Sequence, residues 1–132
     1  MVNIQVNKNT IPVTIGELEF EYSLTDKNVV SFEKLAASSE QALVGVLKDF
    51  EDKTIDETEM VDKANAELTV LFDLFLGEGA YQKIYEQTPS VITNAEIFME
   101  LIVGIREESD KLEEQKNKKR KSKIDQYKKR KK

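Results

Sequence analysis

The spacing of apolar residues changes once along this chain, and that change limits the folds it can adopt. Between residues 11 and 24 the apolar residues alternate with polar ones, on odd positions up to Ile15 and on even positions from Leu18, either side of Gly16-Glu17. Alternation is typical of half-buried strands, so this stretch predicts a β-hairpin, or one strand interrupted by a bulge. After Thr25-Asp26 the apolar residues recur at three- and four-residue steps, as in amphipathic helices. The pattern predicts an α+β fold that is mostly helical.

The N-terminal region leaves the number of strands open. Pro12 cannot donate a hydrogen bond to a neighbouring strand, so we expect it at a sheet edge. Val2, Ile4 and Val6 also alternate, and they predict a third short strand with Asn7-Lys8-Asn9 as the turn. A frayed chain end is the alternative. The sequence therefore predicts a hairpin of two or three short strands.

Three main helices and one short helical turn are expected after the hairpin. The first spans about 20 residues. It contains Gly45, which costs about 1 kcal/mol relative to alanine inside a helix and therefore suggests a close backbone approach. The second begins at Asp56, which forms a capping-box-like pair with Glu59, and it ends at the glycines of Gly77-Glu78-Gly79. A short helical turn over residues 80–86 follows.

The last helix is predicted to run out of the core and into the C-terminal tail. It opens at Pro89 and Ser90, and its spacing defines one apolar face. That face consists of Val91, Ala95, Phe98, Leu101, Ile102 and Ile105. Acidic and basic residues four positions apart, Glu107 with Lys111 and Glu114 with Lys118, are expected to form ion pairs that support the helix beyond this face.

Charge divides the chain into a body and a tail. Residues 116–132 hold 11 lysines and arginines against the single acid Asp125, a net charge of +10, whereas residues 1–115 hold 9 basic and 24 acidic residues, a net charge of −15. We therefore expect one acidic globular domain over residues 1–115. The basic tail over residues 116–132 is expected to be partly helical and then disordered beyond about residue 120, because apolar support ends and like charges repel.

The basic tail admits three interpretations. It can keep the protein soluble, attract an acidic protein partner, or bind nucleic acid through phosphate contacts. Nucleic acid is not favoured, because the acidic body repels a polyanion and the tail has only Tyr127 for stacking on bases. The residues predicted to make electrostatic contacts are Lys118, Lys119, Arg120, Lys121, Lys123, Lys128, Lys129 and Arg130.

Nothing in the sequence predicts catalysis, a metal or a cofactor. The chain has no cysteine and no histidine, which removes thiolate and imidazole chemistry and nearly all zinc, haem and iron–sulfur sites. Gly77-Glu78-Gly79 is not followed by the Lys-Ser/Thr of a phosphate-binding loop. The acidic stretch 49–59 has Lys53 where a calcium loop needs an oxygen ligand and Thr54 where it needs glycine. The aromatic residues near the glycines are expected in the core; they are Phe72, Phe75, Tyr81 and Tyr85. We expect a non-enzymatic protein.

Residues 64–105, ANAELTVLFDLFLGEGAYQKIYEQTPSVITNAEIFMELIVGI, resemble a known family. A helix ending in Leu-Gly-Glu-Gly, a following Lys-Ile and a second amphipathic helix are similar to small proteins from the tail-gene block of long-tailed bacteriophages and prophages of Gram-positive bacteria. The stretch IGELEFEYSL, residues 15–24, fits the opening hairpin of those proteins. The +10 tail is not a trait of the family and leaves room for a nucleic-acid or connector role.

The resemblance implies a tail assembly chaperone. Such a protein coats the tape-measure protein, prevents its aggregation and helps to recruit tail-tube subunits in the cytoplasm of the bacterial host. Apolar residues off the main helical stripes are candidates for contact with this client or within a homo-oligomer, a broad core face being the alternative. They are Leu74, Leu76, Ile97, Met99 and Val103, with Val29 and Val30 near the start of the first helix. No apolar run reaches the roughly 20 residues of a membrane span.

Two other functions stay open at this point. One is a small nucleic-acid-binding protein that acts through the basic tail, for which two short runs, KKRK at 118–121 and KKRKK at 128–132, would also pass as nuclear-import signals. The other is a structural component of the phage tail or connector. A chaperone should be absent from mature particles, whereas a structural component should be present in them.

Overall fold

The computed structural model describes residues 1–6 and 9–130; within these, the side chains of Tyr127, Lys129 and Arg130 are not described. The secondary structure is mostly helical with one N-terminal hairpin, which confirms the predicted fold class. Its elements are β1 (Thr10–Ile15), β2 (Leu18–Ser23), α1 (Asp26–Glu51), α2 (Glu57–Leu76), α3 (Ala80–Gln87) and α4 (Val91–Arg130). Residues 1–6 form no strand, so the described part of the chain contains two strands and not three.

The N-terminal strands form the predicted hairpin. β1 and β2 pair antiparallel in a two-stranded sheet, with Ile15 opposite Leu18 and a two-residue turn between them. Gly16 opens this turn with φ of 61°, a left-handed conformation that costs glycine little. The change of parity at Gly16-Glu17 therefore marks a turn, and no bulge is needed to explain it.

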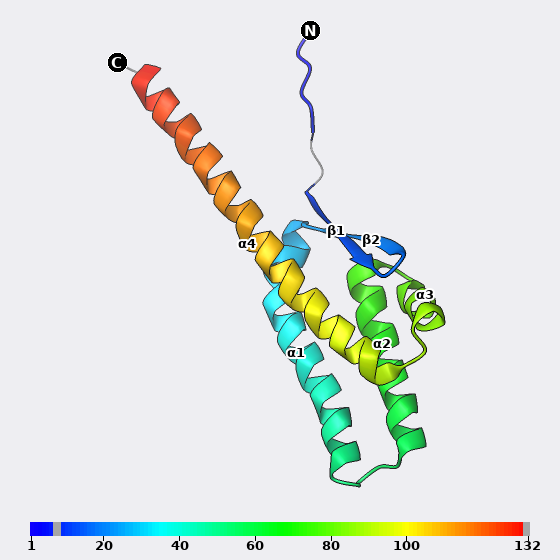
Figure 1. The fold of residues 1–132 in the computed structure, drawn as a ribbon. Helices are drawn as coiled ribbons and strands as arrows, with labels where there is room; N and C mark the ends of the chain where they lie inside the picture. The colour runs from blue at the N-terminus through cyan, green and yellow to red at the C-terminus, as the bar shows by residue number, and fades with distance from the viewer. Residues whose placement is uncertain (7–8, 131–132) are drawn as a thin grey trace.

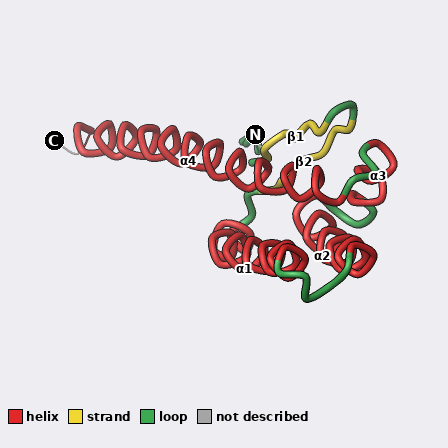
Figure 2. Tube along the Cα trace, turned by 60° about the horizontal axis from the view of Figure 1, so that its bottom comes forward, coloured by secondary structure: helices red, strands yellow, loops and turns green. Residues whose placement is uncertain are grey.

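The helices pack as a layer crossed by the last helix. α1 and α2 run antiparallel beside each other, and α4 crosses them diagonally (Figure 1). The hairpin contacts α2 through β2 and α4 through β1. Figure 2 shows that the C-terminal part of α4 projects well beyond the other elements. The body is thus built around the first half of α4, while its second half leaves the body.

Aromatic side chains form the centre of the core. Tyr22 and Phe32 lie with their ring centroids 6.2 Å apart. Phe75 contacts Phe32 and Phe98 edge to face and meets Tyr22 in a tilted arrangement. The predicted aromatic residues Phe72, Phe75 and Tyr81 are buried, and Tyr85 is half-buried against the same cluster. All six residues of the predicted apolar face of α4 are buried as well. The sequence pattern therefore identified the core correctly.

The helix starts follow the capping residues. Thr25 Oγ1 accepts a hydrogen bond from the Asn28 amide at 3.2 Å, and Asp56 Oδ1 accepts one from the Glu59 amide at 2.8 Å. These bonds satisfy amide groups that have no partner inside the helix. The carboxylate of Glu59 does not complete a reciprocal box and instead lies 3.3 Å from Lys63 Nζ. α2 ends at Gly77, as predicted.

Four smaller expectations are wrong. α1 is 26 residues long, not about 20. A Cβ added at Gly45 would meet no atom within 4 Å, so no close backbone approach explains this glycine. Lys111 pairs with Glu108 at 3.6 Å rather than with Glu107. The predicted pair between Glu114 and Lys118 is also not formed between these described, exposed side chains.

α4 continues as a helix through Arg130, past the position near residue 120 beyond which the sequence predicts disorder. Leu112 is the last half-buried residue that packs against the core, and every described side chain after it is exposed. The helix persists without tertiary support because lysine, arginine, glutamate and glutamine all have high intrinsic helix propensity. Loss of the apolar pattern marked the end of burial, not the end of the helix.

Candidate interaction surfaces

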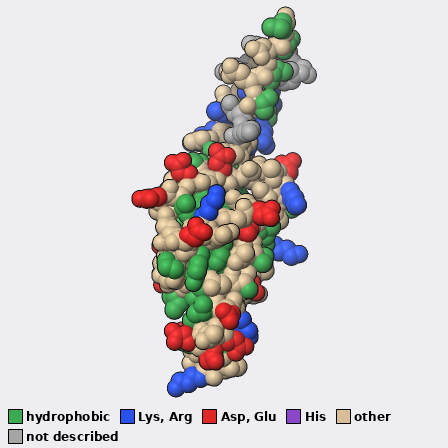
Figure 3. All heavy atoms as spheres, turned by 90° about the vertical axis from the view of Figure 1, so that its right-hand side faces the viewer, with side chains coloured by type: hydrophobic (Ala, Val, Ile, Leu, Met, Phe, Trp, Pro, Cys, Tyr) green, Lys and Arg blue, Asp and Glu red, His purple; other side chains and the backbone are tan. Residues whose placement is uncertain are grey.

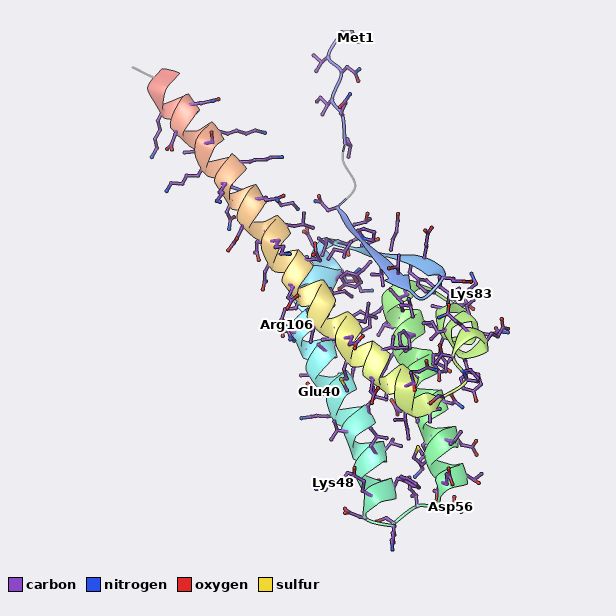
Figure 4. The ribbon with its side chains drawn as sticks, in the orientation of Figure 1. Met1, Glu40, Lys48, Asp56, Lys83 and Arg106 are labelled. Atoms are coloured by element: carbon purple, nitrogen blue, oxygen red, sulfur yellow. The ribbon has the colours of Figure 1, made fainter. Side chains whose placement is uncertain are left out.

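The second half of α4 presents the basic residues singled out from the sequence. The side chains of Lys118, Lys119, Arg120, Lys121, Lys123 and Lys128 are all exposed, and no ion pair joins them to another described side chain. The predictions for Lys129 and Arg130 lie outside the described side chains. Figure 4 shows long side chains radiating from this part of α4 into solvent. We call residues 116–130 the basic extension.

The basic extension suits an electrostatic partner better than an apolar one. At 1.5 Å per residue it is about 22 Å long. At about 100° per residue, Lys118, Lys119, Arg120 and Lys121 already point to different sides of the helix. Among the described side chains of the basic extension, Ile124, which is 49% exposed, is the only apolar one. Such a helix attracts an acidic protein surface or a phosphate backbone through charge alone.

An ion pair joins α4 to α1 ten residues before the basic extension begins. Arg106 donates from Nε to Glu33 Oε1 at 2.9 Å and from Nη2 to Oε2 at 3.1 Å. Its guanidinium also lies 5.8 Å from the ring centroid of Phe32, and Figure 4 marks Arg106 on α4 beside α1. The hydrogen bond from Arg106 lowers the pKa of the Glu33 carboxyl. Sequence reasoning missed this pair because its members lie 73 positions apart.

A largely buried polar cluster joins α2, α3 and α4. Tyr81 donates from its hydroxyl to Asn65 Oδ1 at 2.7 Å and accepts from Asn94 Nδ2 at 3.4 Å. Asn94 is fully buried and also donates to the Thr88 carbonyl at 2.8 Å, while its Oδ1 has no partner. Burial raises the pKa of the Tyr81 hydroxyl. We assign this cluster to positioning of the helices, because it faces the core.

The cluster could have been found from the sequence. Asn94 lies three residues after Val91 and four before Phe98, and both neighbours belong to the predicted apolar face of the last helix. A polar residue on such a face needs buried hydrogen-bond partners. The position of Asn94 was therefore a signal, although the sequence does not name its partners.

The apolar residues predicted to contact a client separate into two groups. Leu74 and Val103 are 59% and 49% exposed. Leu76, Ile97 and Met99 are half-buried and pack against the core, so these three belong mainly to the broad core face that was the alternative interpretation. Val29 and Val30 are also exposed.

Two further exposed residues extend the apolar surface. Val70 lies four positions before Leu74 on α2 and is 62% exposed, and Ile92 lies on α4 eleven positions before Val103 and is 48% exposed. Residues four or eleven apart share one face of a helix. Figure 3 shows hydrophobic side chains gathered on part of the molecular surface with acidic groups around them. The outward faces of α2 and α4 thus each carry an exposed apolar pair.

A groove of about 550 Å³ separates β1 from α4. Its apolar lining includes Ile15 from the strand and Ile97 and Leu101 from the helix, and the exposed Glu100 and Glu108 also line it. Gln87 closes one end, because its side chain contacts the hairpin turn. The groove was not predicted, because it depends on how the hairpin sits against α4.

The described part of the chain holds no group of three or more Asp or Glu side chains placed to bind a metal ion. Among the helices that the structure describes, none combines the length and apolarity needed to cross a membrane.

Comparison with known proteins finds no matching family model, curated protein or solved structure.

Proposed function

We propose that this protein is a non-enzymatic tail assembly chaperone of a long-tailed bacteriophage or prophage, acting in the cytoplasm of the bacterial host. Its client is the tape-measure protein, tail-tube subunits, or both. One observation carries the proposal: the exposed apolar residues Val70, Leu74, Ile92 and Val103 all lie within residues 64–105, the stretch that resembles this family. The stretch that resembles the family therefore carries exposed apolar side chains on both α2 and α4.

The physical requirements of such a chaperone agree with these features. A long helical client exposes apolar segments before assembly, and small apolar surfaces repeated along it bind it through many weak contacts. The chaperone itself must stay soluble, which a charge of −15 over residues 1–115 favours. The basic extension adds attraction to acidic segments of the client. No step in this role requires a catalytic group.

The proposal is tested by removing the exposed apolar side chains. Leu74→Ser combined with Val103→Ser is compared with Ala37→Ser combined with Val44→Ser, which changes exposed side chains of α1 that were not among the predicted client contacts. Exposed substitutions of this kind change stability by about 0.5 kcal/mol or less, which circular dichroism verifies. Each variant is co-expressed with the tape-measure protein of the same genome, and soluble tape-measure protein is quantified. We expect a several-fold loss for the first pair only; equal recovery with both pairs contradicts the proposal.

A nucleic-acid-binding role is the second candidate, and the basic groups of the extension whose side chains the structure describes favour it, because they are exposed and form no ion pair with another described side chain. Retention on random duplex DNA is measured at low and high salt with the full chain and with a chain truncated after Gln115. Phosphate contacts release counterions, so such binding falls steeply with salt and is lost with the extension. DNA retention with this behaviour, in a protein that does not solubilise the tape-measure protein, would replace the chaperone proposal.

A structural role in the tail or connector is distinguished by location. The protein is quantified in purified mature particles by mass spectrometry. A chaperone is released before maturation, so stoichiometric presence in particles would favour the structural role.

A further inference from the structure

β1 has a free edge that presents unpaired backbone groups. Leu24 N donates to the Asn9 carbonyl at 2.8 Å, which marks residues 9 and 24 as a hydrogen-bonded pair. Bonded and non-bonded pairs alternate in an antiparallel ladder, so the backbone groups of Thr10, Pro12 and Thr14 point away from β2. Thr10 and Thr14 offer a donor and an acceptor each, while Pro12 offers only its carbonyl. This edge can accept another strand.

The groove beside this edge has room for apolar side chains. Its helical wall is the stripe of α4 that contains Ile97, Leu101 and Gly104. A Cβ added at Gly104 would meet no atom within 4 Å, so the space above this glycine is open. Ile15 and Leu101 are already buried at the base of the groove. A strand that continued the sheet beyond β1 would therefore bury its inward side chains on an apolar surface.

Residues 1–6, Met-Val-Asn-Ile-Gln-Val, have the pattern that such a strand requires. Val2, Ile4 and Val6 alternate with polar residues, yet they are 86%, 76% and 86% exposed and the segment forms no strand of its own. Figure 1 shows the segment leading away from the hairpin and from α4. Its six residues at about 3.4 Å each match the six residues of β1. The chain thus contains a segment with the pattern of a strand that is not paired, and a sheet edge that is not paired.

We propose that residues 1–6 of a second copy of this chain bind as a third strand on β1, with their apolar side chains in the groove. In antiparallel pairing, Asn3 and Gln5 take the hydrogen-bonded positions opposite the outward backbone groups of β1. The apolar residues then stand opposite Ile11 and Val13, on the face that β1 turns toward the body. A shift of the added strand by one residue would turn Val2, Ile4 and Val6 toward solvent. Burial of these side chains therefore selects this register.

Charge and geometry favour a second copy as the occupant. Residues 1–9 contain Lys8 and no acidic residue, whereas the exposed Glu100 and Glu108 line the groove. Opposite charges steer such a segment toward the groove. The segment leads away from its own β1, so it can reach a neighbouring copy while its own groove accepts another strand. The inference concerns self-association and does not depend on the proposed chaperone function.

The first experiment blocks the groove without removing core contacts. Gly104→Leu places a side chain in the open space above α4, and Gly45→Leu is the matched control, because a Cβ there also meets nothing within 4 Å. Both changes replace a helical glycine by a better helix former. Sedimentation velocity of the full chain is recorded over a dilution series. We expect concentration-dependent association for the parent and for Gly45→Leu, and a monomer for Gly104→Leu. A monomeric parent, or association of Gly104→Leu equal to that of the parent, overturns the proposal.

The second experiment identifies the occupant. The chain has no cysteine, so a copy with Ile4→Cys is mixed with a copy with Val13→Cys or Ile11→Cys and oxidised. Cross-strand positions of this kind bring Cβ atoms within reach of a disulfide. We expect a disulfide between the two copies, with Gln5→Cys as the control that faces the opposite side and does not link. A variant with both cysteines that links only within one chain shows that the segment closes on its own β1 and overturns the proposal.

Discussion

Gln87 holds the hairpin turn from the end of α3, and its removal tests how β1 is positioned along the groove. Its Oε1 accepts from the Glu17 amide at 3.0 Å, and its Nε2 donates to the Ile15 carbonyl at 3.2 Å. A Cβ built at Gly16 would lie 2.6 Å from Nε2. Gly16→Ala and Gln87→Ala therefore disturb the same contact from opposite sides.

The magnitudes follow from these two bonds and one backbone angle. Gln87→Ala removes two hydrogen bonds at the surface, a loss of about 1–2 kcal/mol. Gly16→Ala forces alanine into the left-handed region at φ 61°, which costs about 1–2 kcal/mol. It also displaces Gln87 and so breaks the same two hydrogen bonds, which brings the total to about 2–4 kcal/mol. In the double variant the bonds are lost only once. Its cost should equal that of Gly16→Ala alone, about 1–2 kcal/mol less than the sum of the single costs.

The assay is urea unfolding of the parent, both single variants and the double variant, followed by far-ultraviolet circular dichroism. The free energies of unfolding complete a double-mutant cycle, and unchanged m-values verify that the unfolded states are comparable. If the two costs add without coupling, Gln87 does not contact the turn in solution. The argument that α3 sets the position of β1 is then refuted.

Three further predictions concern buried and paired polar groups. Asn94→Asp places a carboxylate against a backbone carbonyl in the core and should destabilise the fold by about 2–4 kcal/mol at neutral pH. The loss should be smaller in acid, where the protonated carboxyl can donate a hydrogen bond to that carbonyl. Urea unfolding at two pH values measures both losses. The hydrogen bond from Arg106 lowers the pKa of the Glu33 carboxyl. The ionised carboxylate therefore stabilises the fold above the pKa of the unfolded state, and this stabilisation is lost as pH falls through the pKa of the folded state. The free energies of unfolding of Glu33→Gln and the parent should differ at neutral pH and converge in acid. Burial raises the pKa of the Tyr22 and Tyr81 hydroxyls above 10.0, so the stability of the fold should decline as pH rises through their folded-state pKa values. Tyrosinate absorbance measures the ionisation, and circular dichroism measures the loss of structure.

Local rules predicted the elements of this fold well. The switch of apolar residues from odd to even positions at Gly16 located the turn, and Asp56 located the start of α2. The apolar spacing from Val91 to Ile105 identified the buried face of α4. Each of these depends on residues within a few positions of one another. The same rules predicted a close backbone approach at Gly45 that the structure lacks, because a glycine in a helix does not show whether another segment packs against it.

The surfaces were less predictable because they depend on packing between distant segments. Periodicity placed Leu74 and Leu76 equally off the main stripe, but only the structure separates the exposed side chain from the half-buried one. The groove exists because β1 lies beside the stripe of α4 that contains Gly104, and nothing local to either segment specifies that contact. The pair of Arg106 with Glu33 is hidden from the sequence for the same reason.

The end of the core divides this protein into two parts that can act independently. Leu112 is the last residue of α4 packed against the core, and the described side chains beyond it are exposed, so the basic extension adds almost no buried surface to the body. Truncation after Gln115 should therefore leave the urea midpoint of the body nearly unchanged while it removes most of the positive charge. A partner held by the apolar faces of α2 and α4 survives that truncation, and a partner held by charge does not. Because the two parts are so weakly linked in stability, a loss of binding on truncation reports on the basic extension itself and not on an unfolded body.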